Sequence, residues 1–137
     1  MVYLTRKEHF NAAHQLYNYD WSEEKNFEVF GKCANKNFHG HNFDLFVTVK
    51  GNPNPETGFV MNAHVLSKLM KQEIVARLDH KNLNLDVPEF TGMMLSTEIV
   101  VQQIWNWLLP HIVSNNCQLH CIKLYETENI YVEYFGE

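Results

Sequence analysis

An alternation of apolar and polar side chains between Asn42 and Lys50 constrains the fold of this chain more than any other feature. Every second residue of the run is apolar: Phe43, Leu45, Val47 and Val49. A period of two is typical of a strand with one face in the core, and the turn-forming segment 51–55 ends the run. Because an apolar sheet face must be covered, the chain needs a second layer.

Two amphipathic helices are predicted to form that layer. Apolar residues recur at helical spacing over about 63–78 and again within 96–110. Further strands are predicted over 2–14 and as a hairpin within 117–135. The order ββααββ predicts an α+β fold, with a four-stranded antiparallel sheet and two helices on one face.

Composition limits the class of protein. The 137 residues suit one domain of ordinary size, and no linker divides 1–137. A net charge of −5 argues against generic binding to nucleic acid or to anionic membranes. No apolar run is long enough to span a membrane, the N-terminal residues do not resemble a signal peptide, and the three cysteines form no Cys-x-x-Cys pair. A cytoplasmic protein with reduced thiols is therefore expected.

A candidate metal site comes directly before the alternating run. His39 and His41 are two residues apart on the expected strand, so both rings point to one face, and Gly40 leaves room for a ligand. His14, which follows two alanines, is the best candidate for a third ligand. Three neutral histidines with an open fourth position are typical of catalytic zinc. Surface or core histidines are the alternative, whereas a zinc finger is disfavoured without a cysteine pair.

Cys33 and the pair Asp79-His80 are candidates for proton transfer. Cys33 would close the metal site as a fourth ligand, or act just outside it as a thiolate whose pKa is lowered by the metal and by Lys32. A buried structural cysteine is the alternative. Asp79 would orient His80 if the helix ends there; otherwise the two are a helix-terminal charge and a solvated histidine.

Candidate ligand-binding groups lie further along the chain. Glu126 shares the parity of Ile122 and Leu124, so its carboxylate either faces inward, toward a guanidine-like donor edge, or ends the strand exposed. Ser96 and Thr97 are expected to cap a helix and could offer hydroxyl and backbone N–H groups to a ligand. Four other histidines have no ligand spacing and receive no role: His9, His64, His111 and His120.

Seven segments, in this order, resemble the 6-pyruvoyltetrahydropterin synthase family. They are FNAAH at 10–14, FGKC at 30–33, HGH at 39–41, TGFVMN at 57–62, LDHKNLN at 78–84, STE at 96–98 and YET at 125–127. The resemblance implies the tetrahydropterin-synthase fold (T-fold), whose subunits join edge to edge and stack as a homohexamer of two trimers. It also implies zinc on three histidines, which are His14, His39 and His41.

The resemblance further implies a lyase. By position, Cys33 is similar to the family's catalytic base, and Asp79 and His80 to partners from a neighbouring subunit. Glu126 is similar to the pterin anchor, with two helpers, Ser96 and Thr97. The implied reaction converts 7,8-dihydroneopterin triphosphate into 6-pyruvoyltetrahydropterin and triphosphate in tetrahydrobiopterin biosynthesis, with Zn²⁺ as Lewis acid and Mg²⁺ as a candidate ion for the triphosphate.

Three departures and two alternatives accompany this resemblance. Gln15 stands where Arg is frequent, Phe38 where Gly is common, and Ser96 where Thr is usual. The first alternative is 6-carboxytetrahydropterin synthase of deazaguanine (queuosine) biosynthesis, but the five residues between Cys33 and His39 exceed the spacing typical of that branch. The second is a non-catalytic zinc-binding module, which would have no need of Cys33.

Overall fold

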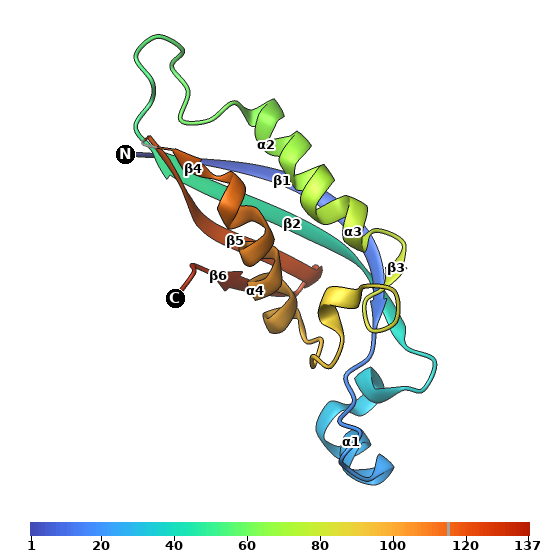
Figure 1. The fold of residues 1–137 in the computed structure, drawn as a ribbon. Helices are drawn as coiled ribbons and strands as arrows, with labels where there is room; N and C mark the ends of the chain where they lie inside the picture. The colour runs from blue at the N-terminus through green and yellow to red at the C-terminus, as the bar shows by residue number, and fades with distance from the viewer. Residues whose placement is uncertain (115) are drawn as a thin grey trace.

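Four long antiparallel strands form the body of the sheet in the computed structural model, which describes residues 1–114 and 116–137 (Figure 1). They are β1 (Val2–His14), β2 (His39–Gly51), β5 (Cys117–Thr127) and β6 (Ile130–Tyr134). β2 lies between β1 and β5, and β6 pairs with β5. The α+β class and the predicted order of the long strands are therefore confirmed.

Two short strands correct the predicted four-stranded, purely antiparallel sheet. β3 (Lys81–Asn82) pairs in parallel with β1, and β4 (Val113–Ser114) pairs with β5. The sheet path is β3-β1-β2-β5-β4, so its orientation is mixed. A strand of two residues has no periodicity, so only the long-range backbone pairing reveals it.

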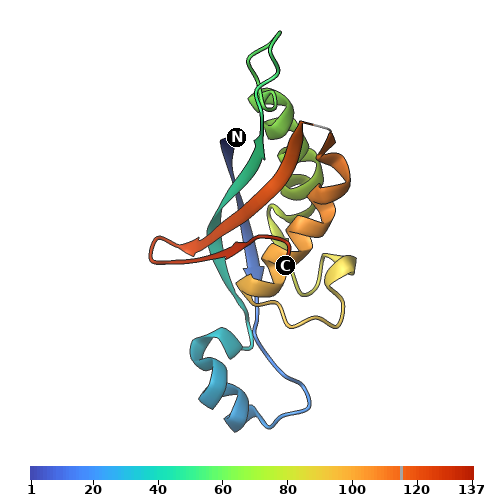
Figure 2. The ribbon, with the colours of Figure 1, turned by 90° about the vertical axis from the view of Figure 1, so that its left-hand side faces the viewer.

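The two predicted helices cover one face of the sheet (Figure 2). The first is continuous through α2 (Ala63–Met70), a π-helical segment (Lys71–Val75) and α3 (Ala76–Leu78). The second is α4 (Thr97–Leu108), which ends in a short 3₁₀ turn (Leu109–His111). Fully buried side chains from both layers fill the space between them, among them Phe43, Leu45, Leu66, Ile74 and Ile104. No helix in the described ranges is both long and apolar enough to cross a membrane.

An additional helix, α1 (Glu23–Phe30), lies beyond the end of the sheet at which β1 stops and β2 starts (Figure 1). Its sequence has little apolar periodicity, which explains why it was not predicted. Ser22 caps it by accepting from the Lys25 N–H, and the buried Asn26 amide donates to two backbone carbonyls. The 3₁₀ segment that follows (Gly31–Ala34) returns the chain toward β2. Another 3₁₀ turn (Pro88–Phe90) precedes α4.

A β-bulge at His120 decides which side chains of β5 face the helices. Thr48 pairs with Cys121 and Val49 with Leu119, so His120 is an extra residue on β5. An extra residue shifts the alternation of a strand. Buried positions accordingly change from odd numbers before the bulge to even numbers after it, at Ile122 and Leu124. The shift places Glu126 on the helix side of the sheet.

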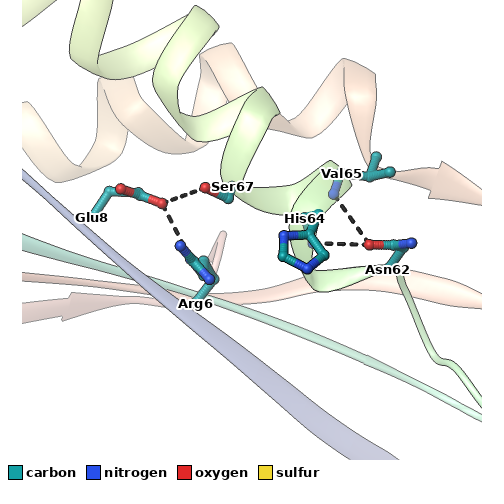
Figure 3. Close-up of polar contacts among 6 residues, drawn as sticks. All are labelled: Arg6, Glu8, Asn62, His64, Val65 and Ser67. Carbon is teal, nitrogen blue, oxygen red and sulfur yellow. Dashed lines mark hydrogen bonds and ion pairs between the residues drawn. The ribbon is translucent and has the colours of Figure 1, made fainter.

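A half-buried carboxylate joins β1 to the first helix (Figure 3). Glu8 accepts hydrogen bonds from the Ser67 hydroxyl at 2.5 Å and from Arg6 Nε at 3.1 Å. Burial alone would raise the pKa of Glu8, but these donors and nearby positive charge outweigh it and hold that pKa below its usual value. At the start of the same helix, Asn62 accepts from two backbone N–H groups and acts as the N-cap (Figure 3).

We expect Glu8→Gln to lower the free energy of unfolding by about 1 kcal/mol near about pH 7, because it weakens a half-buried, charged hydrogen bond. The lowered pKa means that this stabilisation is present above the unfolded-state value of about 4.5 and disappears as pH falls through the folded-state value. Urea unfolding at several pH values measures this. Exposed Glu56→Gln is the control; a Glu8→Gln deficit that persists undiminished in acid would contradict the prediction.

Candidate metal centre

The structure brings three histidine rings together at the end of the sheet nearest α1. β1 ends at His14 and β2 begins at His39, and these two residues are partners in the antiparallel register. His41, two residues along β2, faces the same side. The ring centroids of the three histidines lie 4.6 Å, 4.8 Å and 5.2 Å apart. One small ion could therefore contact all three rings.

The unpartnered nitrogens of these rings fit a bound cation. Within the described residues, His14 Nε2, both ring nitrogens of His39, and His41 Nε2 are buried without a hydrogen-bond partner. A buried polar atom without a partner costs about 1–3 kcal/mol, so such a cluster is a poor choice for a purely structural core. A metal ion would bind the free lone pairs and remove that cost.

A backbone carbonyl sets the tautomer of His14. His14 Nδ1 lies 2.7 Å from the Leu95 carbonyl oxygen, so Nδ1 carries the proton and donates it. The lone pair of Nε2 then points to the centre, the arrangement typical of a metal-binding histidine. Sequence reasoning missed Leu95, because a backbone acceptor leaves no signal in the residue type.

Burial keeps the other two rings neutral. It lowers the pKa of His39, with further lowering from the His14 and His41 rings. It also lowers the pKa of His41, against an opposing effect of the nearby Glu126 carboxylate. Since a histidine must be unprotonated to bind a metal, these shifts favour metal binding near neutral pH.

Glu126 completes the cluster from β5. Its Oε1 lies 3.3 Å from His14 Nε2 and 3.2 Å from His41 Nε2. One donor atom from each of the four side chains lies within 4.8 Å of the others. The His14 ring does most to lower the pKa of Glu126, and His41 and the Thr97 hydroxyl add to it, while burial opposes them. The carboxylate is therefore ionised, able to neutralise an ion or to accept from a ligand.

Cys33 lies on the 3₁₀ segment after α1, close enough to the centre for its thiol to respond to Glu126. Its backbone carbonyl accepts from the Leu16 N–H at 2.9 Å, which ties this segment to the residues that follow His14. Burial, and secondarily the Glu126 charge, raise the pKa of the Cys33 thiol. Lys32 was expected to lower the pKa of Cys33, but it is not among the groups that shift this pKa. A thiolate at Cys33 therefore requires additional positive charge.

Asp79 and His80 lie elsewhere, at the β1 edge of the sheet. The helix ends at Leu78, as the proposed pairing requires, and His80 Nδ1 lies 2.9 Å from Asp79 Oδ2. The backbone N–H of Asn11 donates to Asp79 and does most to lower its pKa. The adjacent cavity of about 730 Å³ is lined by β-strand residues such as His9, Asn11 and Asn42, whose side chains alternate onto the face opposite the metal centre.

Ser96 and Thr97 stand at the start of α4, directly after Leu95. Thr97 is buried and acts on Glu126, whereas Ser96 holds the N-cap position without a capping side-chain hydrogen bond. Gln15 has a structural role: its amide donates to the carbonyl oxygens of Ala34 and Asn35. Gln15, one of the three positions that depart from the family pattern, therefore holds the segment that carries Cys33.

Known proteins resemble this chain over nearly its whole length. The sequence model of the family described as 6-pyruvoyl tetrahydropterin synthase matches residues 3–137. A Pongo abelii protein named 6-pyruvoyl tetrahydrobiopterin synthase is 46% identical over 137 residues, covering 98% of this chain and 91% of that protein. A Dictyostelium discoideum protein of the same name is 41% identical over 136 residues, covering 99% and 97%.

A solved structure shares the fold. The Caenorhabditis elegans 6-pyruvoyl tetrahydropterin synthase superposes with a TM-score of 0.90 at 33% identity, covering 99% of this chain and 96% of that chain. By contrast, a 6-carboxy-5,6,7,8-tetrahydropterin synthase of Rickettsia typhi is 26% identical over 149 residues, covering 97% of this chain and 99% of that protein.

We expect Cys33 in the metal-free protein to react slowly with iodoacetamide near neutral pH, because burial and Glu126 hold it as a thiol. Glu126→Gln should lower its pKa and shift the rate–pH curve toward lower pH. Mass spectrometry of the Cys33 peptide follows the reaction, and the buried Cys117 and Cys121 are internal controls. Identical curves for both proteins would show that the Glu126 charge does not reach Cys33.

Proposed function

The chain belongs to the 6-pyruvoyl tetrahydropterin synthase family, and we propose that it is a metal-dependent lyase that converts 7,8-dihydroneopterin triphosphate into 6-pyruvoyl tetrahydropterin and triphosphate. One observation carries the proposal at the level of the site: three histidines present buried ring nitrogens without hydrogen-bond partners to one point beside an ionised carboxylate. A lyase acting on this substrate needs a Lewis acid next to a group that can hold the pterin, and the cluster supplies both.

We propose zinc as the metal, on the three histidines. Neutral imidazole suits Zn²⁺, and a set of three leaves a coordination position for substrate oxygen. Zn²⁺ bound there would supply a Lewis acid for the substrate's side-chain hydroxyls and positive charge near Cys33. His14 keeps its orientation through the Leu95 carbonyl, so this ligand is set before an ion arrives.

Glu126 is the proposed anchor for the pterin ring. Its lowered pKa keeps it ionised, so it can accept from the ring N–H and amino groups together. Thr97 lies against the carboxylate and limits its movement, and Ser96 offers its hydroxyl at the start of α4. With the pterin held in this way, the substrate side chain would extend toward the histidines.

Cys33 is the proposed base. Its raised pKa leaves it a protonated thiol in the protein alone. Positive charge at the histidines would counter the Glu126 carboxylate and favour the thiolate. Cys33 would then take a proton from the substrate side chain only when the centre is loaded, which couples base activation to occupancy of the site.

Asp79 and His80 would act on the substrate of another copy of the chain. The pair lies at the β1 edge, and the His80 side chain is 82% exposed, so its own chain leaves it uncovered. Asp79 remains ionised and would stabilise a protonated His80 during proton transfer. An active site shared between copies, in a homohexamer, would place this pair against a neighbour's histidines.

The related 6-carboxytetrahydropterin synthase reaction starts from the same substrate. The higher identity to relatives named 6-pyruvoyl tetrahydrobiopterin synthase supports the pyruvoyl product, as does the spacing between Cys33 and His39. Chromatography of the product formed from 7,8-dihydroneopterin triphosphate separates the two, and 6-carboxytetrahydropterin as the main product would reject the assignment.

We expect Cys33→Ala to keep its metal and lose at least about a hundredfold in turnover, because it removes a general base. His41→Ala should lose both metal and turnover. Metal content by mass spectrometry and the product assay with and without chelator measure these outcomes. Loss of metal from Cys33→Ala would instead make Cys33 a ligand.

Mixing two inactive variants tests the shared site. In an equal mixture of Cys33→Ala and His80→Ala chains, about one quarter of sites formed between random neighbours contain both intact groups. We therefore expect activity to return to about a quarter of native after subunit exchange. If mixed oligomers form but the mixture recovers no activity, each site is built within one chain.

A further inference from the structure

Gln15 is a buried polar residue next to a proposed metal ligand. It follows His14 directly, and only 6% of it is exposed. Its Nε2 donates to the backbone carbonyl oxygens of Ala34 at 3.2 Å and Asn35 at 3.1 Å, and its Oε1 accepts from the Tyr19 hydroxyl at 3.3 Å. Two carbonyl acceptors require the amide nitrogen, so the orientation of the amide is defined. A buried amide whose two ends are both hydrogen-bonded favours a single position.

The Cys33 segment, residues 31–35, ends in three successive carbonyl groups that accept hydrogen bonds from Gln15 and Leu16. The Cys33 carbonyl oxygen accepts from the Leu16 N–H at 2.9 Å, and the next two carbonyls accept from the Gln15 amide. The last carbonyls of a helical segment find no partner within it, so contacts of this kind decide where the segment lies. Two of these three hydrogen bonds come from one side chain, that of Gln15.

The backbone of Gln15 is itself held by a different part of the chain. Its N–H donates to Asn84 Oδ1 at 2.9 Å, and its carbonyl oxygen accepts from Asn84 Nδ2 at 3.2 Å. One residue earlier, His14 Nδ1 lies 2.7 Å from the Leu95 carbonyl oxygen and donates to it. The end of β1 is thus fixed independently of the Cys33 segment. Gln15 therefore links the position of the Cys33 segment to that of His14.

We propose that Gln15 is a positioning residue for Cys33: its amide holds the Cys33 segment against the end of β1 and so keeps the thiol beside the metal centre. The proposal rests on the proposed function, in which Cys33 is the base. The segment follows α1, which lies beyond the end of the sheet (Figure 1), so packing between sheet and helices does not by itself fix it. A base must lie within hydrogen-bond reach of the proton that it removes, and a displacement of about 1 Å costs about a hundredfold in rate.

Gln15→Met tests the role of the amide in the full-length protein. The two side chains are similar in length, but methionine has no N–H group to donate to the carbonyls. Loss of two hydrogen bonds should raise the population of chains with a displaced Cys33 segment by about tenfold. In the metal-free protein at a fixed pH, Cys33 should therefore react with iodoacetamide up to about tenfold faster, because it is less shielded. Unchanged rates at the buried Cys117 and Cys121 show that the core is intact.

Steady-state kinetics with 7,8-dihydroneopterin triphosphate measure the catalytic consequence. We expect the kcat of Gln15→Met to fall by about tenfold to a hundredfold. KM should change by less than about threefold, because Cys33 is proposed to take a proton and not to bind the substrate. Zinc content, measured by mass spectrometry, should stay native, because His14 keeps its Leu95 partner.

Three further variants complete the comparison. Gln15→Arg keeps N–H donors and introduces the residue that is frequent at this position in the family, so kcat and the Cys33 rate should stay close to native. Gln15→Ser is too short to reach the carbonyls but leaves room for water to satisfy them, so it should repeat the loss and replaces Gln15→Met if that variant does not fold. Gln102→Met makes the same replacement at an exposed position of α4 and should change neither quantity.

Four results would contradict these expectations. A native kcat or a native Cys33 rate in Gln15→Met would overturn the positioning role, as would a loss in Gln15→Arg as large as that in Gln15→Met. A fall in kcat that follows loss of zinc would overturn it in favour of a role at the metal. A native protein that forms no product would instead reject the proposed function, while the Cys33 rates, which need no substrate, would still show whether Gln15 holds the segment.

Discussion

The antiparallel pairing of β1 with β2 is the constraint on which the rest of the structure depends. Its register places His14 opposite His39, although the sequence separates them by a helix and a loop. The same register puts the apolar residues of both strands on the face that the helices cover. A slip of one residue would turn one strand's side chains to the other face, so core formation and assembly of the metal centre depend on the same backbone hydrogen bonds.

Charge at the centre links its parts to one another. One buried and two half-buried histidine rings, together with an ionised carboxylate, form a site suited to a cation, within a chain that carries a net charge of −5. Burial, and secondarily the Glu126 carboxylate, raise the pKa of Cys33. The carboxylate that favours a bound cation therefore also disfavours the thiolate until a cation balances its charge. Metal binding and base activation would therefore be coupled, with positive potential toward a triphosphate confined to the site.

The candidate functional groups lie on two parts of the sheet. The histidines, Glu126 and Thr97 gather on the helix side, while Asp79 and His80 lie at the β1 edge. The second group has a carboxylate fixed by a backbone N–H and an exposed imidazole. The cavity beside it is lined by residues other than the histidines of the metal centre. A chain of this size can form a complete site around a pterin by using a second copy of itself.

The sequence by itself determined the long strands, the two covering helices and the shared face of His39 and His41. It also indicated that Glu126 lies on the same face of its strand as Ile122 and Leu124. These features follow from local periodicity, which residue types carry directly. Only the tertiary structure decided the parallel pairing of β3, the bulge at His120, the Leu95 acceptor for His14, and the separation of His80 from the metal centre. Each depends on long-range contacts of backbone groups. Because these groups are the same in nearly every residue type, the sequence gives no signal for such contacts.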